Sequence, residues 1–142
     1  MLHIRVARRQ GRFQVDADFK AVNTGITALF GPSGAGKTSV IDMVAGLIRP
    51  DRGRIVVQDR VLFDSDRGID LPPEKRSIGY IFQDGRLFPH LTVRGNLTYG
   101  MKLTPQSRRC IAFDQAVDLL GIKHLLDRRP GETVQVVLTY TG

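Results

Sequence analysis

The sequence predicts an α/β fold, on three observations about one stretch of chain. Residues 31–38 read "GPSGAGKT", which has the spacing of a Walker A phosphate-binding loop: a glycine, four residues, then glycine, lysine and a hydroxyl residue. The nearly continuous apolar run "GITALFG" at residues 25–31 is typical of a strand buried on both faces of a parallel sheet. The run "KTSVIDMVAGLI" that follows has the period of a helix. Strand, loop and helix in this order predict a P-loop NTPase.

Alternation of apolar and polar residues predicts antiparallel strands on either side of this unit. Residues 2–8 and 12–19 alternate across Gly11 and predict a hairpin, and residues 54–59 and 60–65 predict a second strand pair. The run "SIGYIFQ" at residues 77–83 predicts a further buried strand. In the helix after the loop, the residues expected to face the core are Val40, Ile41, Val44, Leu47 and Ile48.

The C-terminal half has weaker patterns. Residues 84–100 are rich in glycine and polar residues and predict a loop. Residues 108–121 predict a helix that ends at Gly121, and residues 122–131 predict a short helical turn. Residues 132–142 return to strand-like alternation.

Composition narrows the class of protein. The 142 residues suffice for one domain, and no apolar run approaches the length of a membrane span. The single cysteine, Cys110, has no partner for an internal disulfide. The net charge of +7 favours anionic partners: nucleotide phosphates, nucleic acid or a phospholipid surface. The arginines are scattered without interleaved aromatics, so we expect no nucleic-acid partner.

The loop predicts the chemistry of phosphate binding. Lys37 supplies a positive charge for the β- and γ-phosphates, and Thr38 offers a hydroxyl to Mg²⁺. Glycine is required where the backbone approaches the phosphates. The residues expected to contact the nucleotide are Gly31, Pro32, Ser33, Gly34, Ala35, Gly36, Lys37, Thr38 and Ser39. The alternative is a glycine-rich turn that binds nothing.

Hydrolysis requires more than the loop. A second carboxylate must hold Mg²⁺ at the end of a buried strand, and another group must orient the attacking water. The run "RVLFD" ends in Asp64, but Ser65 and Asp66 stand where a catalytic glutamate is wanted. Hairpin patterning favours a surface position for Asp64.

Three segments in order carry a family resemblance: "GITALFGPSGAGKTSVIDMVAGLIRPDRGRI", "LPPEKRSIGYIFQDGRLFPHLTVRGNLTYGM" and "LLGIKHLLDRRPG". They resemble the ATP-binding subunits of ABC importers, and among these the molybdate importers most. The resemblance covers residues 1–131 and implies the first half of a nucleotide-binding domain: a P-loop core, an antiparallel β subdomain and the start of a helical subdomain. Residues 132–142 then form a tail outside the family pattern.

The resemblance implies further roles. ATP and Mg²⁺ are the cofactors, with Lys37 and Gln83 catalytic and Thr38 and Gln83 at the metal. Gln83 falls on the family's Q-loop glutamine, which contacts Mg²⁺ and the attacking water. Phe13 matches the aromatic residue that stacks on adenine, although a core position is also open to it. Loop residues 86–90 correspond to the surface that docks the transmembrane permease.

The resemblance also implies an assembly and a location. ATP hydrolysis by a homodimer drives transport, and the subunit is peripheral on the cytoplasmic face of the inner membrane. After Gly131 the family has the LSGGQ signature, the Walker B strand and a switch histidine, where this sequence reads "ETVQVVLTYTG". Either a truncation or frameshift, or a short paralogue, accounts for that difference, and we expect negligible hydrolysis by this chain on its own. A small P-loop kinase or GTPase, or a nucleic-acid-binding module, are the alternative functions.

Overall fold

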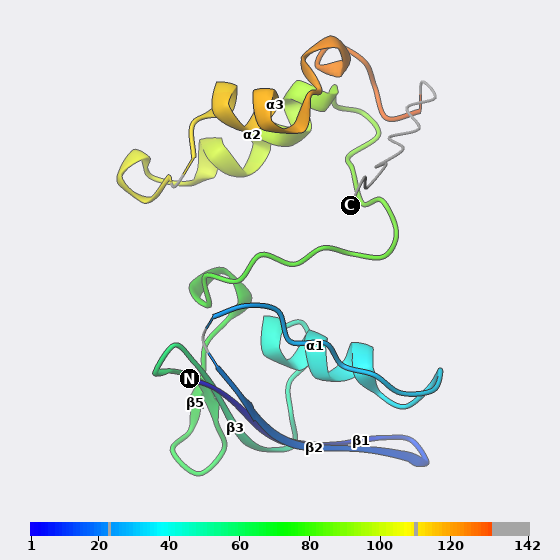
Figure 1. The fold of residues 1–142 in the computed structure, drawn as a ribbon, viewed down its shortest axis with the longest axis vertical. Coiled ribbons are helices and arrows are strands. Elements are labelled where there is room, and N and C mark those ends of the chain that lie inside the picture. The colour runs from blue at the N-terminus through cyan, green and yellow to red at the C-terminus, as the bar shows by residue number, and fades with distance from the viewer. Residues whose placement is uncertain (23, 110, 132–142) are drawn as a thin grey trace. The chain divides into compact units, whose positions relative to one another are not determined.

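The structure is a computed structural model that describes residues 1–22, 24–109 and 111–131. The chain divides into two compact units, Met1–Ile81 and a second that begins at Phe82. Each unit is described by itself below (Figure 1).

The first unit is built on an antiparallel sheet. Five strands are described, in the spatial order β2-β1-β3-β4-β5. Their bounds are β1 Leu2–Gln10, β2 Phe13–Ala21, β3 Arg52–Val57, β4 Arg60–Asp64 and β5 Ile69–Asp70. β1 pairs with β2 from Leu2↔Ala21 to Gln10↔Phe13, and β3 pairs with β4. Both predicted strand pairs are confirmed: each strand finds its backbone hydrogen-bond partner in the strand that follows it after a short turn.

Helix α1, Lys37–Ala45, packs on one face of this sheet (Figure 1). Val40 and Met43 of the helix join Ile4, Ile55 and Phe63 of the strands in one buried cluster. The predicted inner face of the helix is partly wrong.

Of its predicted inner residues, Val40 is buried, whereas Ile41 and Leu47 are about half exposed. The helix ends at Gly46, whose left-handed φ of 84° turns the chain before Leu47 could join that face. Met43, outside the predicted set, is completely buried.

The two strands predicted for a parallel sheet are wrong. Residues 25–31 and 77–83, all of which the structure describes, form no strand. Ile26, Phe30 and Ile81 are almost fully exposed. A strand buried on both faces needs a neighbour on each side for its backbone hydrogen bonds, and the five described strands pair with one another instead.

The regular elements among the described residues of the second unit are all helical. Its elements are α2 Val93–Leu103, η2 Gln106–Arg108, α3 Phe113–Leu120 and η3 Lys123–Leu125, while a short η1 helix, Pro73–Lys75, belongs to the first unit. The turn predicted within 122–131 is confirmed by η3, and α3 is a shorter form of the predicted helix, ending at Gly121. The strand-like residues 132–142 and Cys110 lie outside the described residues.

The loop predicted for residues 84–100 is wrong over its second half, where α2 forms. Gly95 and Gly100 lower its intrinsic helix propensity and obscured it in the sequence. The structure supplies what propensity lacks, because the Thr92 side chain caps the helix by accepting from the Gly95 N–H at 3.1 Å. The N–H groups of Val93 and Arg94 donate to backbone carbonyls at residues 128 and 126, 2.8 and 2.9 Å away.

Candidate functional site

The loop of residues 31–36 leads directly into helix α1. Gly34 and Gly36 have φ values of 80° and 86°, a backbone conformation that favours glycine. The Ala35 N–H donates to the Pro32 carbonyl at 3.2 Å, so the loop closes a tight turn before the helix begins at Lys37. The sequence motif thus forms a turn with exposed backbone and without side-chain obstruction at either positive-φ glycine.

The first turn of α1 suits an anion. Among the described residues, none caps this end through a side chain, and none of the first-turn residues is acidic. The free N–H groups and the positive end of the helix dipole at this terminus both favour negative charge. Together with the loop, they make a site into which phosphate oxygens fit.

Lys37 completes this arrangement. Its Nζ donates to the carbonyls of Gly31 and Pro32, each at 2.7 Å. The ammonium therefore lies across the loop, between the turn and the start of the helix, where an entering phosphate would meet it. Thr38 is exposed, and Ser39 is directed to the sheet, because its hydroxyl donates to Gln10 Oε1 at 3.3 Å.

The structure brings Phe13, the first residue of β2, to the loop. A Cβ built on Gly36 would lie 3.4 Å from Phe13 Cε1 and 3.0 Å from Val15 Cγ2. The Phe13 side chain is 44% exposed, so it is not a core residue. An aromatic face beside a phosphate loop is suited to stacking on a base.

Gln83 lies in the second unit, one residue after that unit begins. It is exposed, and it belongs to a bend that follows residues 77–82, which have no regular secondary structure. The structure therefore brings together the predicted site residues Phe13 and 31–39 within the first unit, and describes Gln83 separately from them.

A groove of about 450 Å³ lies beside the start of α1, with Lys37 and Thr38 on its wall. The rest of its lining is mostly apolar and comes from the sheet, from α1 and from the two segments that were predicted as strands, residues 25–31 and 77–83. Those residues are Leu2, Ile4, Phe19, Thr27, Leu29, Val40, Ile41, Val44, Ala45, Ile78, Gly79, Tyr80 and Ile81. Apolar surface of this kind does not bind phosphate, so the loop rather than the groove is the candidate site.

Asp64 is a structural residue, and the predicted surface position is wrong. Its side chain is 8% exposed, and its Oδ1 accepts from the N–H groups of Asp66 and Arg67 at 3.1 and 3.2 Å. Arg54 Nε lies 3.4 Å from its other oxygen. The carboxylate is therefore used in shaping the turn after β4.

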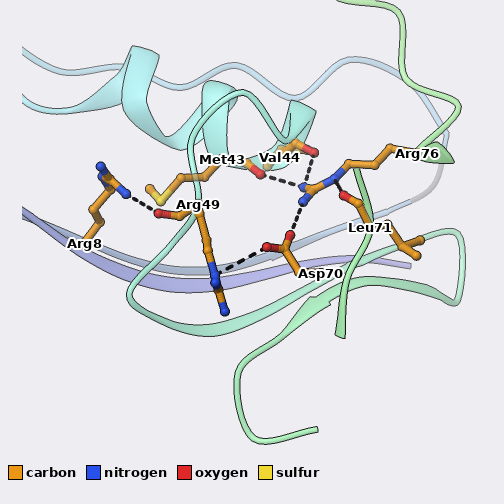
Figure 2. Close-up of polar contacts among 7 residues, drawn as sticks. All are labelled: Arg8, Met43, Val44, Arg49, Asp70, Leu71 and Arg76. Carbon is orange, nitrogen blue, oxygen red and sulfur yellow. Dashed lines mark hydrogen bonds and ion pairs between the residues drawn. The ribbon is translucent and has the colours of Figure 1, made fainter. Parts of the chain in front are cut away.

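A buried arginine that the sequence did not single out links the end of α1 to residues 70–71 (Figure 2). Arg76 donates from Nη1 to the carbonyls of Met43 and Val44 at 2.8 and 2.9 Å, and from Nε to Leu71 at 2.7 Å. Its Nη2 lies 3.1 Å from Asp70. Burial lowers the pKa of Arg76, Asp70 opposes that change, and a guanidinium remains charged in proteins.

A second contact joins the same two parts of the chain. The hydroxyl of Tyr80 donates to Asp42 Oδ1 of α1 at 2.5 Å. In the sequence, Arg76 sits in the charged run "PPEKRS", which indicates solvent exposure, so no signal pointed to either contact. Together they fix the segment before Gln83 to the helix that begins at Lys37.

In the second unit, the loop ahead of α2 borders another groove, of about 420 Å³. The lining includes Arg86, Leu87 and Phe88, which the sequence predicts as a partner surface, together with Leu97 and Leu125. Leu87 and Phe88 are 55% and 41% exposed. This groove is mostly apolar.

Among the described residues, His, Cys, Asp and Glu side chains form no group of three or more that could hold a metal ion. None of the helices in the described part of the chain is long and apolar enough to cross a bilayer.

Comparison with known proteins agrees with the loop and the fold. Residues 15–138 match the model of the ABC transporter family. The Molybdenum import ATP-binding protein ModC of Rhodospirillum rubrum is 64% identical over 132 residues, and its counterpart in Paramagnetospirillum magneticum is 60% identical over 132. Each alignment covers 93% of this chain, but the chain spans 35% and 36% of the length of these relatives.

Solved structures agree on the fold. The dimeric post-hydrolysis state of an ATP-binding cassette bound to ADP and Pi has a TM-score of 0.68 with 18% identity, covering 94% of this chain and 63% of the other. A dimeric bacterial ABC transporter cassette gives the same values. The predicted P-loop fold class is confirmed, and the family match sets the chain apart from the small kinases and GTPases considered above. With its glycine-rich loop, its antiparallel sheet and a family match over most of its length, the chain belongs to the ABC transporter family.

Proposed function

We propose that the chain is the nucleotide-binding part of an ATP-binding subunit of an ABC importer, with molybdate as the transported solute. The observation that carries the proposal is the loop itself, in which Lys37 Nζ lies 2.7 Å from two loop carbonyls at the open start of α1. The names and identities of the two relatives support molybdate as the solute.

In this proposal the nucleotide is ATP, with Mg²⁺. The N–H groups of residues 33, 34 and 36–38 and the Lys37 ammonium bind the phosphates, and the Phe13 ring stacks on adenine. The Thr38 hydroxyl, exposed at the first turn of α1, is a suitable oxygen ligand for Mg²⁺ when the other ligands are phosphate oxygens and water. The ion would neutralise phosphate charge, and Gln83 would orient the attacking water near it.

The proposed partners follow from family membership. The surface of Arg86, Leu87, Phe88, Pro89 and His90 docks the transmembrane permease, and two ATP-binding subunits form the active dimer. The subunit then lies on the cytoplasmic face of the inner membrane. The exposed apolar side chains of Leu87 and Phe88 support a protein partner for this surface.

Nucleotide-dependent thermal stabilisation of the purified chain tests the proposal. A ligand at a hundred times its Kd stabilises a protein by about 2.7 kcal/mol, so Mg–ATP should raise the melting temperature clearly. Lys37→Ala should abolish the shift, whereas Lys20→Ala, which removes an exposed lysine from β2, should keep it. Equal shifts with Lys37→Ala and the unmodified chain would contradict phosphate binding at this loop, and a preference for GTP over ATP would contradict the proposed nucleotide.

A further inference from the structure

We propose that Asn96 is the residue that holds the predicted permease-docking loop in its binding conformation. The inference rests on the proposed function for the identity of the partner, but not for the behaviour of the loop. Asn96 lies one turn into α2, and neither the motifs nor the family comparison assigns it a role.

The side-chain amide of Asn96 is bound on both of its ends by the loop. Its Oδ1 accepts from the Phe88 N–H at 2.7 Å, and its Nδ2 donates to the Phe88 carbonyl at 3.1 Å. Nδ2 also lies 3.0 Å from the Thr92 carbonyl and 3.4 Å from that of Leu91. Because a backbone N–H can only donate and a carbonyl can only accept, this set of partners defines the orientation of the amide.

These contacts fix the part of the loop that displays apolar side chains. Asn96 forms hydrogen bonds with both the N–H and the carbonyl of Phe88. The Phe88 ring lies against Tyr99, with centroids 4.7 Å apart, and against His90 at 5.8 Å. The ring is nevertheless 41% exposed, and Leu87 beside it is 55% exposed. Burial of apolar side chains therefore contributes little to the order of this loop, and the hydrogen bonds of Asn96 are what hold its backbone in place.

Order in the free loop matters for docking. A partner that binds a disordered loop must overcome the entropy of ordering its residues. A loop already held in place avoids much of that loss and binds more tightly. Asn96 is therefore a positioning residue for the partner surface, acting through Phe88.

Amide hydrogen exchange tests the mechanism without any partner. In Asn96→Ala the Phe88 N–H loses its acceptor, and we expect its protection to fall about tenfold, the factor that corresponds to about 1.4 kcal/mol. The α2 amides from Leu97 to Met101 should keep their protection. Thr98→Ala is the matched control, since that hydroxyl donates to the Arg94 carbonyl within α2, and it should leave Phe88 unchanged. Unchanged exchange at Phe88 in Asn96→Ala, or an equal loss along the whole of α2, would overturn the proposal.

Capture of the purified transmembrane subunit of a molybdate importer in detergent tests the consequence. Asn96→Ala should weaken capture about tenfold while Mg–ATP still raises the melting temperature. Asn96→Asp keeps an acceptor but lacks a donor until its carboxylate is protonated. Its capture should therefore recover only as the pH falls toward the ordinary aspartate pKa of about 3.9, whereas Asn96→Ala shows no such recovery.

The two readouts separate the two proposals. If the unmodified chain captures no permease, the docking part of the proposed function fails, and exchange at Phe88 still decides the role of Asn96. If the unmodified chain captures the permease and Asn96→Ala captures it equally well, the positioning role is wrong while the proposed function stands.

Discussion

The guanidinium of Arg76 lies against Gly46 at the C-terminal end of helix α1. A Cβ on Gly46 would stand 2.6 Å from Arg76 Nε and 2.8 Å from Cζ, closer than real contacts allow. The missing side chain at Gly46 gives the guanidinium the space from which it binds the Met43 and Val44 carbonyls. These two residues together close the end of the helix, since the last carbonyls of a helix need partners from outside it.

Gly46→Ala should therefore destabilise the first unit for two separate reasons. The left-handed backbone at φ 84° costs a residue with a Cβ about 1 kcal/mol, and the clash with Arg76 adds to this. Gly68→Ala is the matched control, because Gly68 has φ 65° and open space around it. Urea unfolding should show about 1 kcal/mol of loss for Gly68→Ala and at least twice as much for Gly46→Ala. Equal losses would mean that Arg76 moves aside without penalty.

Arg76→Ala should be among the most damaging single changes in the first unit. The carbonyls of Leu71, Met43 and Val44 would lose the guanidinium that donates to them. Because these contacts are shielded from water, we expect about 3 kcal/mol of destabilisation. Arg49→Ala removes the other arginine that pairs with Asp70, at 3.4 Å, but its side chain is 73% exposed. That control should cost at most about 1 kcal/mol in the same urea titration. A comparable loss in both variants would refute the importance of burial here.

Tyr80 and Asp42 should be energetically coupled, because their hydrogen bond joins the segment of residues 77–83 to α1. The hydrogen bond of 2.5 Å to a carboxylate predicts a coupling energy of about 1–2 kcal/mol in a double-mutant cycle of Tyr80→Phe and Asp42→Ala. The measurement is the free energy of unfolding of the four variants. The exposed pair Arg94 and Asp127, 3.7 Å apart, offers a comparison cycle with an expected coupling below about 1 kcal/mol. Additive effects of the Tyr80 and Asp42 changes would show that the contact contributes nothing.

Phe13→Ala should weaken ATP binding without affecting the phosphate site. Stacking of a base on an aromatic ring is worth about 1–3 kcal/mol, so the Kd for Mg–ATP should rise about tenfold or more. Phe13→Trp keeps an aromatic face and should bind nearly as well as the unmodified chain. Tripolyphosphate, which has no base, serves as the internal control in calorimetry. If its affinity falls together with that of ATP in Phe13→Ala, the ring supports the loop near Gly36 and does not stack on adenine.

The sequence could predict the parts of the fold that depend on near neighbours. Alternation in residues 2–8 and 12–19 was enough for the β1–β2 hairpin, because the partner strand follows after a short turn. The need for glycine in the loop of residues 31–36 could also be predicted. Gly34 and Gly36 take the positive φ values that their lack of a side chain permits.

The remaining features depend on contacts between distant parts of the chain. The apolar runs at residues 25–31 and 77–83 have the composition of buried strands, yet a strand forms when a neighbour supplies hydrogen bonds, and the described strands pair elsewhere. Arg76 looks like a surface charge in its own segment and is buried because the end of α1 meets it.

By itself, the sequence predicted the hairpins and the turn of the glycine-rich loop, because each depends on residues a few positions apart. It also carried the family resemblance, in the order of three segments along residues 1–131. Only the tertiary structure decided which apolar segments are covered, where Phe13 stands relative to Gly36, and which polar side chains hold loops and helix ends. Those outcomes depend on burial and hydrogen-bond partners that the folded chain brings from tens of residues away.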